Sequence, residues 1–136
     1  MTVLIDVLNA ASALESRVDA RLAGVGLSLP KLAALHALVN AGDALPLGQL
    51  AERLACVKSN VTQLVERLET DGLVRRAFDP TDRRSRLAAI TDAGRRAYEE
   101  GIRIQCEAEK DLFRALSADE TAQLTRLIGK LDRRCG

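Results

Sequence analysis

The sequence predicts a single, mainly α-helical domain that carries one small β-hairpin. A chain of 136 residues is the size of one domain with a core of its own. Leucine and alanine dominate its apolar residues and aromatic residues make up only 2%, a composition that favours helix over sheet. Apolar residues recur at intervals of three and four along most of the chain. This pattern breaks around one Asp-Pro turn signal, where the hairpin is expected.

Composition and charge exclude several classes of protein. A hydrophobic content of 47% is ordinary for a folded chain, while 29% charged residues argue against a membrane protein. No apolar run reaches the roughly 18 residues that a membrane helix needs. The N-terminus lacks the basic region of a signal peptide, and Asp6 interrupts its apolar run. We therefore expect a cytoplasmic protein that has no membrane partner.

Residues with catalytic or metal-binding chemistry are sparse. Cys56, Cys106 and Cys135 are odd in number and show no CxxC or histidine spacing, which argues against a disulfide framework and a zinc site. The sequence shows no nucleophile–base pair, no metal-ligand cluster and no glycine-rich phosphate loop. We therefore expect no enzyme activity, no metal and no cofactor.

Two amphipathic helices are predicted before Pro46. Apolar residues spaced by three and four form one stripe over residues 3–22, and the Gly-Val-Gly segment at 24–26 ends this helix. Ser28 and Pro30 are typical of a helix start, and the second helix keeps its leucines on one face. The segment NAGDALP then breaks this second helix.

A tight turn joins the next two predicted helices. Pro46 is tolerated in the first turn of the short helix PLGQLAERLA, and a turn is expected at Ala55 and Cys56. The helix after the turn has apolar residues at positions 61, 64, 65 and 68, which lie on one helical face. It closes at Asp71-Gly72, since glycine adopts the left-handed cap conformation at little cost.

Residues 72–91 change character and predict the hairpin. Asp79-Pro80 is a turn signal with apolar residues on both sides, so we expect strands at 73–77 and 86–90 around a charged loop. Five arginines against two aspartates give this segment a net charge of +3, although the whole chain carries only +1. These residues are Arg75, Arg76, Arg83, Arg84, Arg86, Asp79 and Asp82.

Two further helices are predicted after the hairpin. Thr91 is expected to cap a long helix whose apolar residues continue to Leu116. Ser117 and Glu120 then form a capping box, S-x-x-E, that opens a last helix with leucines and an isoleucine on one face.

Two helices joined by a tight turn and followed by a basic hairpin form a winged helix-turn-helix. The second helix of the pair exposes polar side chains of the kinds that bind base edges and phosphates in the major groove. They are Lys58, Ser59, Asn60, Thr62, Gln63, Glu66 and Arg67. A solvated helix face would carry the same residue types, so this helix alone leaves both interpretations open.

The basic hairpin favours double-stranded DNA as the partner. Arginine at the tip of a loop can enter a narrow minor groove, where the negative potential is strongest. Asp82 would hold a neighbouring arginine by a charge-assisted hydrogen bond and so stiffen the loop. A surface hairpin kept soluble by its charge is the alternative, which is the weaker interpretation beside a helix-turn-helix.

The segments QLAERLACVKSNVTQLVERLETDGLVRR and DPTDRRSRLAAITDAG resemble the MarR-type transcriptional regulators. The second segment contains Asp-x-Arg followed by five residues, an apolar residue and threonine, here Asp82, Arg84, Ile90 and Thr91. The likeness covers residues 29–98 closely and the flanking helices in pattern.

The resemblance implies a winged-helix lobe at residues 29–98 and a helical dimerisation region at 1–24 and 92–134. It implies a homodimer that binds a pseudo-palindromic operator, most often as a repressor. It also implies that Arg84 is the minor-groove residue of the wing and that Asp82 supports it.

The chain departs from the family pattern at the start of the helix after the turn. Val57 stands where the family often has a capping serine or threonine, so we expect Ser59 or Asn60 to cap this helix. Cys56 precedes the helix N-terminus, where the helix dipole and Lys58 favour a reactive thiolate, so a redox sensor is one interpretation. A small buried residue in the turn is the alternative, and we favour it.

His36 is the only histidine of the chain. It has no histidine or cysteine partner at ligand spacing, so a packed or partly exposed helix residue is the first interpretation. The resemblance also allows it to line an effector pocket between the dimer helices and the DNA-binding lobe. A small-molecule or oxidative signal would then release the DNA. The alternative function is a protein-interaction module that kept the fold and lost DNA binding, and the wing arginines argue against it.

Overall fold

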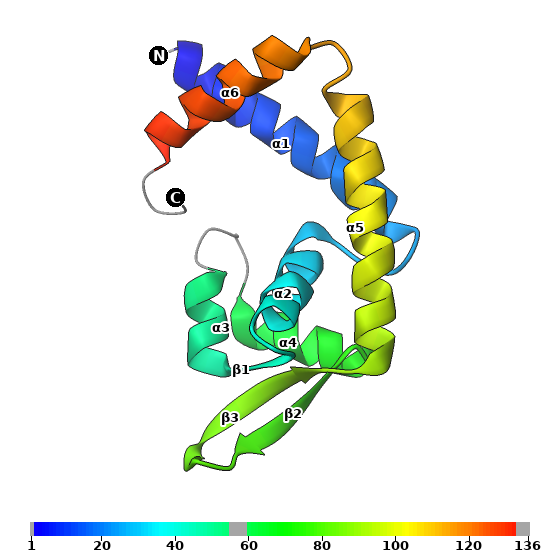
Figure 1. Ribbon diagram of the computed structural model, residues 1–136, viewed down its shortest axis with the longest axis vertical. Coiled ribbons are helices and arrows are strands. Elements are labelled where there is room, and N and C mark those ends of the chain that lie inside the picture. Colours follow the sequence, from blue (N-terminus) through cyan, green and yellow to red (C-terminus); the bar gives the residue numbers. More distant parts are fainter. Residues whose placement is uncertain (1, 55–59, 133–136) are drawn as a thin grey trace.

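The structure, a computed structural model, describes residues 2–54 and 60–132. For residues 82–85 it describes the backbone only. Its elements in chain order are α1 (Thr2–Ala23), α2 (Leu29–Asn40), β1 (Ala44–Pro46), α3 (Leu47–Arg53), α4 (Val61–Thr70), β2 (Val74–Asp79), β3 (Asp82–Ile90), α5 (Asp92–Leu112) and α6 (Ala118–Leu131). Figure 1 shows two parts joined by α5: a lobe of α2, α3, α4 and the sheet, and a second part in which α6 crosses over α1. This mainly helical architecture confirms the predicted fold class.

The core of the lobe is aliphatic, as the composition predicts. Its largest fully buried side chains are Leu22, Leu32, Leu35, Leu38, Leu50, Val65 and Leu68. They come from α1, α2, α3 and α4, and residues of the sheet complete the cluster. The α4 helix buries only its apolar stripe, so its opposite face stays in solvent.

The predicted helix starts are confirmed by their hydrogen bonds. The Ser28 hydroxyl accepts from the Lys31 backbone N–H at the start of α2. The Thr91 hydroxyl accepts from the Gly94 N–H, 3.0 Å away, at the start of α5. At the start of α6, both bonds of the Ser117–Glu120 capping box are present.

The chain between α2 and α3 contains a short strand in addition to the predicted break. Gly42 and Asp43 both have positive φ, 84° and 83°, and this turn lays the next three residues along β3. The resulting strand β1 pairs antiparallel with β3, so the sheet order is β1-β3-β2. Pro46 ends this strand and precedes α3 rather than lying inside its first turn, and an edge strand tolerates the missing N–H.

The hairpin is longer than predicted. Strand β2 extends to Asp79 and β3 begins at Asp82, so most of the predicted charged loop is strand. The Asp79 carboxylate accepts hydrogen bonds from the backbone N–H and the hydroxyl of Thr81, at 2.9 and 2.6 Å. Such local bonding tightens the turn and lets the strands pair almost to the tip. Figure 1 shows this hairpin projecting from the lobe as a wing.

The long helix is shorter than predicted. Helix α5 ends at Leu112, and Phe113 is its C-cap, so Leu116 lies in the connection to α6. There the backbone N–H of Leu116 bonds to the carbonyl of Phe113, a tight turn that reverses the chain before Ser117 caps α6. Among the described helices, none combines the length and the apolar character needed to cross a bilayer.

Candidate nucleic-acid interface

Helix α4 presents the predicted polar face to solvent. Its inner residues Leu64, Val65 and Leu68 are buried against the core. The side chains of the opposite face are exposed, and they are Thr62, Gln63, Glu66 and Arg67. The structure therefore leaves these groups open to a partner. Lys58 and Ser59, which the sequence assigns to the same face, lie outside the described residues, as does Cys56.

Asn60 has a structural task at the start of α4. Its side-chain oxygen accepts the backbone N–H of Gln63, with 3.3 Å between Oδ1 and N, which makes it the N-cap. This confirms the expectation that Asn60 could replace a missing cap at Val57. A bidentate contact to adenine needs both the oxygen and the nitrogen of an amide. The cap occupies the oxygen, whereas the side chain of Gln63 is exposed.

The wing arginines fall into two groups. Arg75 of β2 and Arg86 of β3 are exposed, and the guanidinium of Arg86 lies over the ring of Phe78. The side chains of Asp82, Arg83 and Arg84 lie outside the described part of the structure, so their roles stay predictions.

Arg76 points toward the helix instead. It pairs across the sheet with the fully buried Ala88, and its side chain is only 23% exposed. Its guanidinium approaches the carboxylates of Glu66 and Glu69 on α4, at 3.7 and 3.6 Å. Its Nε is buried and makes no hydrogen bond in the described structure. Ion pairs of this length stabilise weakly, but they join the base of the wing to α4.

Thr91 of the sequence motif also positions the wing. Its hydroxyl donates to the carbonyl of Gly72, 2.7 Å away, and its backbone N–H donates to the carbonyl of Leu73, 3.0 Å away. The same hydroxyl caps α5 through Gly94. The threonine therefore joins the end of α4, the start of β2 and the start of α5. The sequence predicts its helix cap and its place in the motif, but not its two hydrogen bonds to Gly72 and Leu73.

Two ion pairs hold the outside of the lobe. Lys31 at the start of α2 reaches Asp71 at the end of α4, with 2.9 Å between the charged atoms. Arg95 on α5 pairs with Asp43, the residue whose positive φ starts β1. Helix α4 and the sheet are thus each tied to a neighbouring element.

His36 lies on α2 and contacts α5. Its Nδ1 is 2.8 Å from the hydroxyl of Tyr98, and its Nε2 is 2.9 Å from the side-chain nitrogen of Asn40. Since the amide nitrogen donates, Nε2 accepts in the neutral ring and Nδ1 carries the hydrogen that bonds to Tyr98. The histidine therefore links α2 of the lobe to α5.

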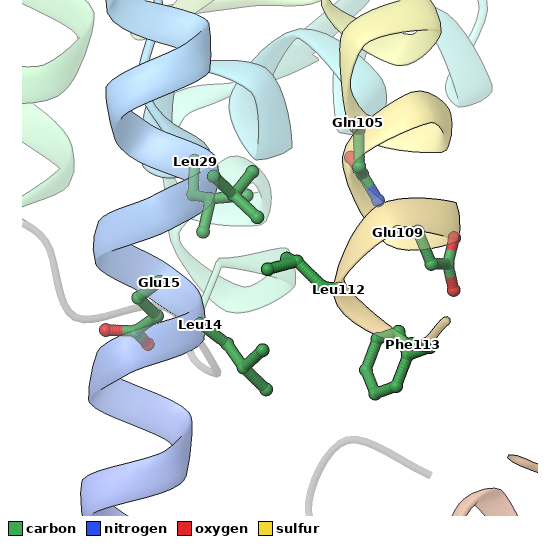
Figure 2. A pocket seen from close by; sticks show the side chains of 8 residues that line it. Leu14, Glu15, Leu29, Gln105, Glu109, Leu112 and Phe113 are labelled. Carbon is green, nitrogen blue, oxygen red and sulfur yellow. The ribbon is translucent and has the colours of Figure 1, made fainter. Parts of the chain in front are cut away.

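An apolar cavity of about 250 Å³ lies between α1 and α5. Its lining residues are Leu14, Glu15, Val18, Leu29, Gln105, Glu109, Leu112 and Phe113. Figure 2 shows Leu112 of α5 pointing toward α1 across this space. His36 is not among the lining residues. Cys106, also on α5, is exposed and free, and no three acidic, histidine or cysteine side chains of the described residues gather as a metal ion would require.

Comparison with known proteins places the chain in a family. Residues 25–85 match the model of the MarR family. The uncharacterized HTH-type transcriptional regulator YkoM of Bacillus subtilis is 34% identical over 105 residues, which are 77% of this chain and 68% of that protein. A probable transcriptional regulator from Pseudomonas aeruginosa has a similar crystal structure, with 28% identity, a TM-score of 0.84 and coverage of 94% of this chain and 95% of that one.

The fold likeness extends to a protein solved with nucleic acid. Sco3205, a MarR family transcriptional regulator from Streptomyces coelicolor in complex with DNA, has a TM-score of 0.81 at 24% identity, over 96% of this chain and 83% of that one. The winged lobe, the exposed polar face of α4 and the sequence relatives all indicate the same family. The chain belongs to the MarR family of DNA-binding transcriptional regulators and is not an enzyme.

Proposed function

We propose that this chain is a homodimeric repressor that binds a pseudo-palindromic operator. Helix α4 enters the major groove and the wing reaches the adjacent minor groove. One observation carries the proposal: the open polar face of α4 lies beside a basic wing that Arg76 and Thr91 hold in place. The complex of Sco3205, a protein of the same fold, with DNA supports it.

In this proposal the polar residues of α4 and the wing have different roles. Gln63 is the base-reading residue of the proposal, because its amide is exposed and serves no cap. Asn60 caps the helix, so its part in base recognition is limited to its side-chain nitrogen. Arg67 and Lys58 contact phosphate, Thr62 and Ser59 add adaptable hydrogen bonds, and Arg75 and Arg83 bind the backbone around the wing. Arg76 is a positioning residue.

Replacing the base-reading and wing residues should change different properties of DNA binding. Gln63→Ala should relax the preference at one base pair in each half-site, at a cost of about 1–3 kcal/mol. Arg84→Ala should weaken binding roughly 10–100-fold, and the loss should follow AT content, because groove width sets the potential that attracts arginine. A titration of each variant against a randomised operator library, at two salt concentrations, measures both effects.

Matched replacements far from the proposed interface serve as controls. Arg114 after α5 and Arg126, on the side of α6 away from its apolar residues, are both exposed, so Arg114→Ala and Arg126→Ala should bind like the wild type. If Arg84→Ala also binds like the wild type throughout, the wing assignment is wrong. If the wild type selects no sequence from the library, the chain is an interaction module and not an operator-binding protein.

We place the effector site of this regulator in the cavity between α1 and α5. Its walls are apolar, and its polar lining residues are Glu15, Gln105 and Glu109. The two carboxylates among them repel an anion and attract a cation. The site therefore suits an apolar molecule that is neutral or carries an amine, and a ligand there would alter the angle between α1 and α5.

Two small probes of opposite charge test this site. We expect 2-phenylethylamine to raise the thermal unfolding midpoint by about 2–8 °C at concentrations well above its Kd, while phenylacetate has no effect. Leu14→Phe, which fills the cavity, should abolish the response to the amine. An equal response to the carboxylate, or a full response in Leu14→Phe, would place the effector elsewhere.

A further inference from the structure

The wing carries an exposed aromatic ring that the assigned roles leave unused. Phe78, near the end of β2, is 69% exposed, although the whole chain has only two phenylalanines. The apolar residues nearer the base of the wing, such as Val74 and Ile90, are buried in the core. Phe78 lies just before the Pro80-Thr81 turn, where the lobe offers it no cover. A large apolar side chain at such a position is typical of a contact surface.

Arg86 holds this ring in place. The two residues are direct cross-strand partners in the β2–β3 ladder. The guanidinium carbon of Arg86 lies 5.7 Å from the centre of the Phe78 ring, within the range of a cation–π contact. Together with Ala77 and Arg76, the pair lines a hollow of about 190 Å³ on the wing. The wing therefore presents one apolar plane and a fixed positive charge side by side.

We propose that the Phe78–Arg86 pair is a second DNA-contacting element of the wing, in which the ring packs against deoxyribose at the wall of the minor groove and Arg86 binds the adjacent phosphate. This inference rests on the proposed function. Deoxyribose is the apolar part of the DNA backbone and phosphate the anionic part, and they alternate at the spacing of neighbouring side chains. A flat ring beside a guanidinium matches that alternation.

Packing on the sugar fits this pair better than insertion between bases. Minor-groove proteins that kink DNA insert a bare apolar wedge, which separates two stacked base pairs. The guanidinium of Arg86 already lies over one side of the Phe78 ring, so the pair is thicker than a single ring. The element therefore contributes affinity without a sharp bend and with little dependence on base sequence.

Replacing the Phe78 ring should separate its apolar contribution to operator affinity from the contribution of the charged residues. Phe78→Ala should lower operator affinity roughly tenfold with an unchanged salt slope, because the lost contact is apolar. Phe78→Tyr, which keeps the ring, should restore most of the affinity. Arg75→Ala, an exposed arginine on the same strand, should instead reduce the salt slope. Titration of the selected operator at several salt concentrations compares these variants.

Other outcomes overturn the inference without touching the proposed function. If Arg84→Ala weakens operator binding and Phe78→Ala leaves it unchanged, Phe78 is not part of the interface. The protein would still be a DNA-binding regulator. A sharp operator bend that Phe78→Ala abolishes would mean a wedge and contradict sugar packing. Because Phe78 is exposed, its variants should unfold at the wild-type temperature, and this measurement excludes a folding defect. Failure of the wild type to bind any duplex would defeat the proposed function itself.

Discussion

Replacing Gly94 with alanine should destabilise the folded chain by about 3 kcal/mol or more. Gly94 lies in the first turn of α5, where an added Cβ would stand 2.1 Å from the carbonyl oxygen of Leu73. The side chain of Ile90 would be only 2.7 Å from it. The oxygen of Leu73 is backbone and already accepts the N–H of Thr91, so no rotamer change relieves the overlap. Helix α5 would have to move away from Leu73, the residue before β2, and break that bond.

Two other helix glycines give matched controls. At Gly101 an added Cβ would meet only the flexible ends of Leu32 and Leu27, at 2.7 and 2.8 Å, so Gly101→Ala should cost about 1 kcal/mol or less. At Gly48 nothing lies within 4 Å, and Gly48→Ala should stabilise by up to about 1 kcal/mol through helix propensity. Urea unfolding at one protein concentration ranks the three variants. A Gly94→Ala variant as stable as Gly48→Ala would disprove the close approach of α5 to the backbone of Leu73.

The sequence predicts the helices well because each has a periodic apolar stripe and a local stop or start signal. Ser28, Thr91 and Ser117 all cap the helices that they are predicted to open. Capping depends on hydrogen bonds within one turn, so it can be read without knowing the tertiary structure. The end of α5 is different, since Phe113 and Leu116 continue an apolar spacing while the chain already reverses toward α6.

The sheet is harder to predict, because its pairing is not local. Strand β1 has only three residues, too few for an alternating pattern, and it exists because the turn at Gly42 and Asp43 brings it to β3. The register of the hairpin also decides what each arginine does. Arg75 and Arg76 are consecutive in the sequence, yet the strand sends one to solvent and the other to the carboxylates of α4.

The sequence also identifies much of the candidate interface, but not its internal roles. The exposed positions of Gln63 and Thr62 follow from helical periodicity. The cap bond of Asn60 and the contact of Arg86 with the Phe78 ring require coordinates. A phenylalanine among the charged residues near the tip of the hairpin is the signal that points to Phe78 in the sequence.

Breaking the proposed dimer should have the largest effect on DNA binding. Helix α6 buries none of its residues within the described chain, and α1 buries only Leu22. The exposed apolar side chains of the two helices are Val3, Leu4, Ile5, Val7, Leu8, Leu127, Ile128 and Leu131. A monomer rarely exposes so many large apolar side chains together, and a second copy related by a two-fold axis would bury both sets at once.

Aspartate on this surface should give a folded monomer. We expect the double variant Leu4→Asp with Leu8→Asp to sediment as a monomer at micromolar concentration, where the wild type sediments as a dimer. Its affinity for a full operator should fall about 1,000-fold, because the second half-site is no longer bound intramolecularly. Ala13→Asp adds one negative charge on the face of α1 opposite Leu4 and Leu8 and should remain a dimer with wild-type affinity.

Half-site spacing provides a separate test of the same symmetry. Recognition helices of a two-fold dimer reach one face of the duplex only when the half-sites lie about one helical turn apart. Inserting half a turn of DNA between them should therefore reduce wild-type affinity to that of the monomeric variant, and should leave the variant itself unaffected. Wild-type protein that sediments as a monomer, or a double variant that still distinguishes the two spacings, would contradict the dimer. The exposed stripes of α1 and α6 would then need a different partner.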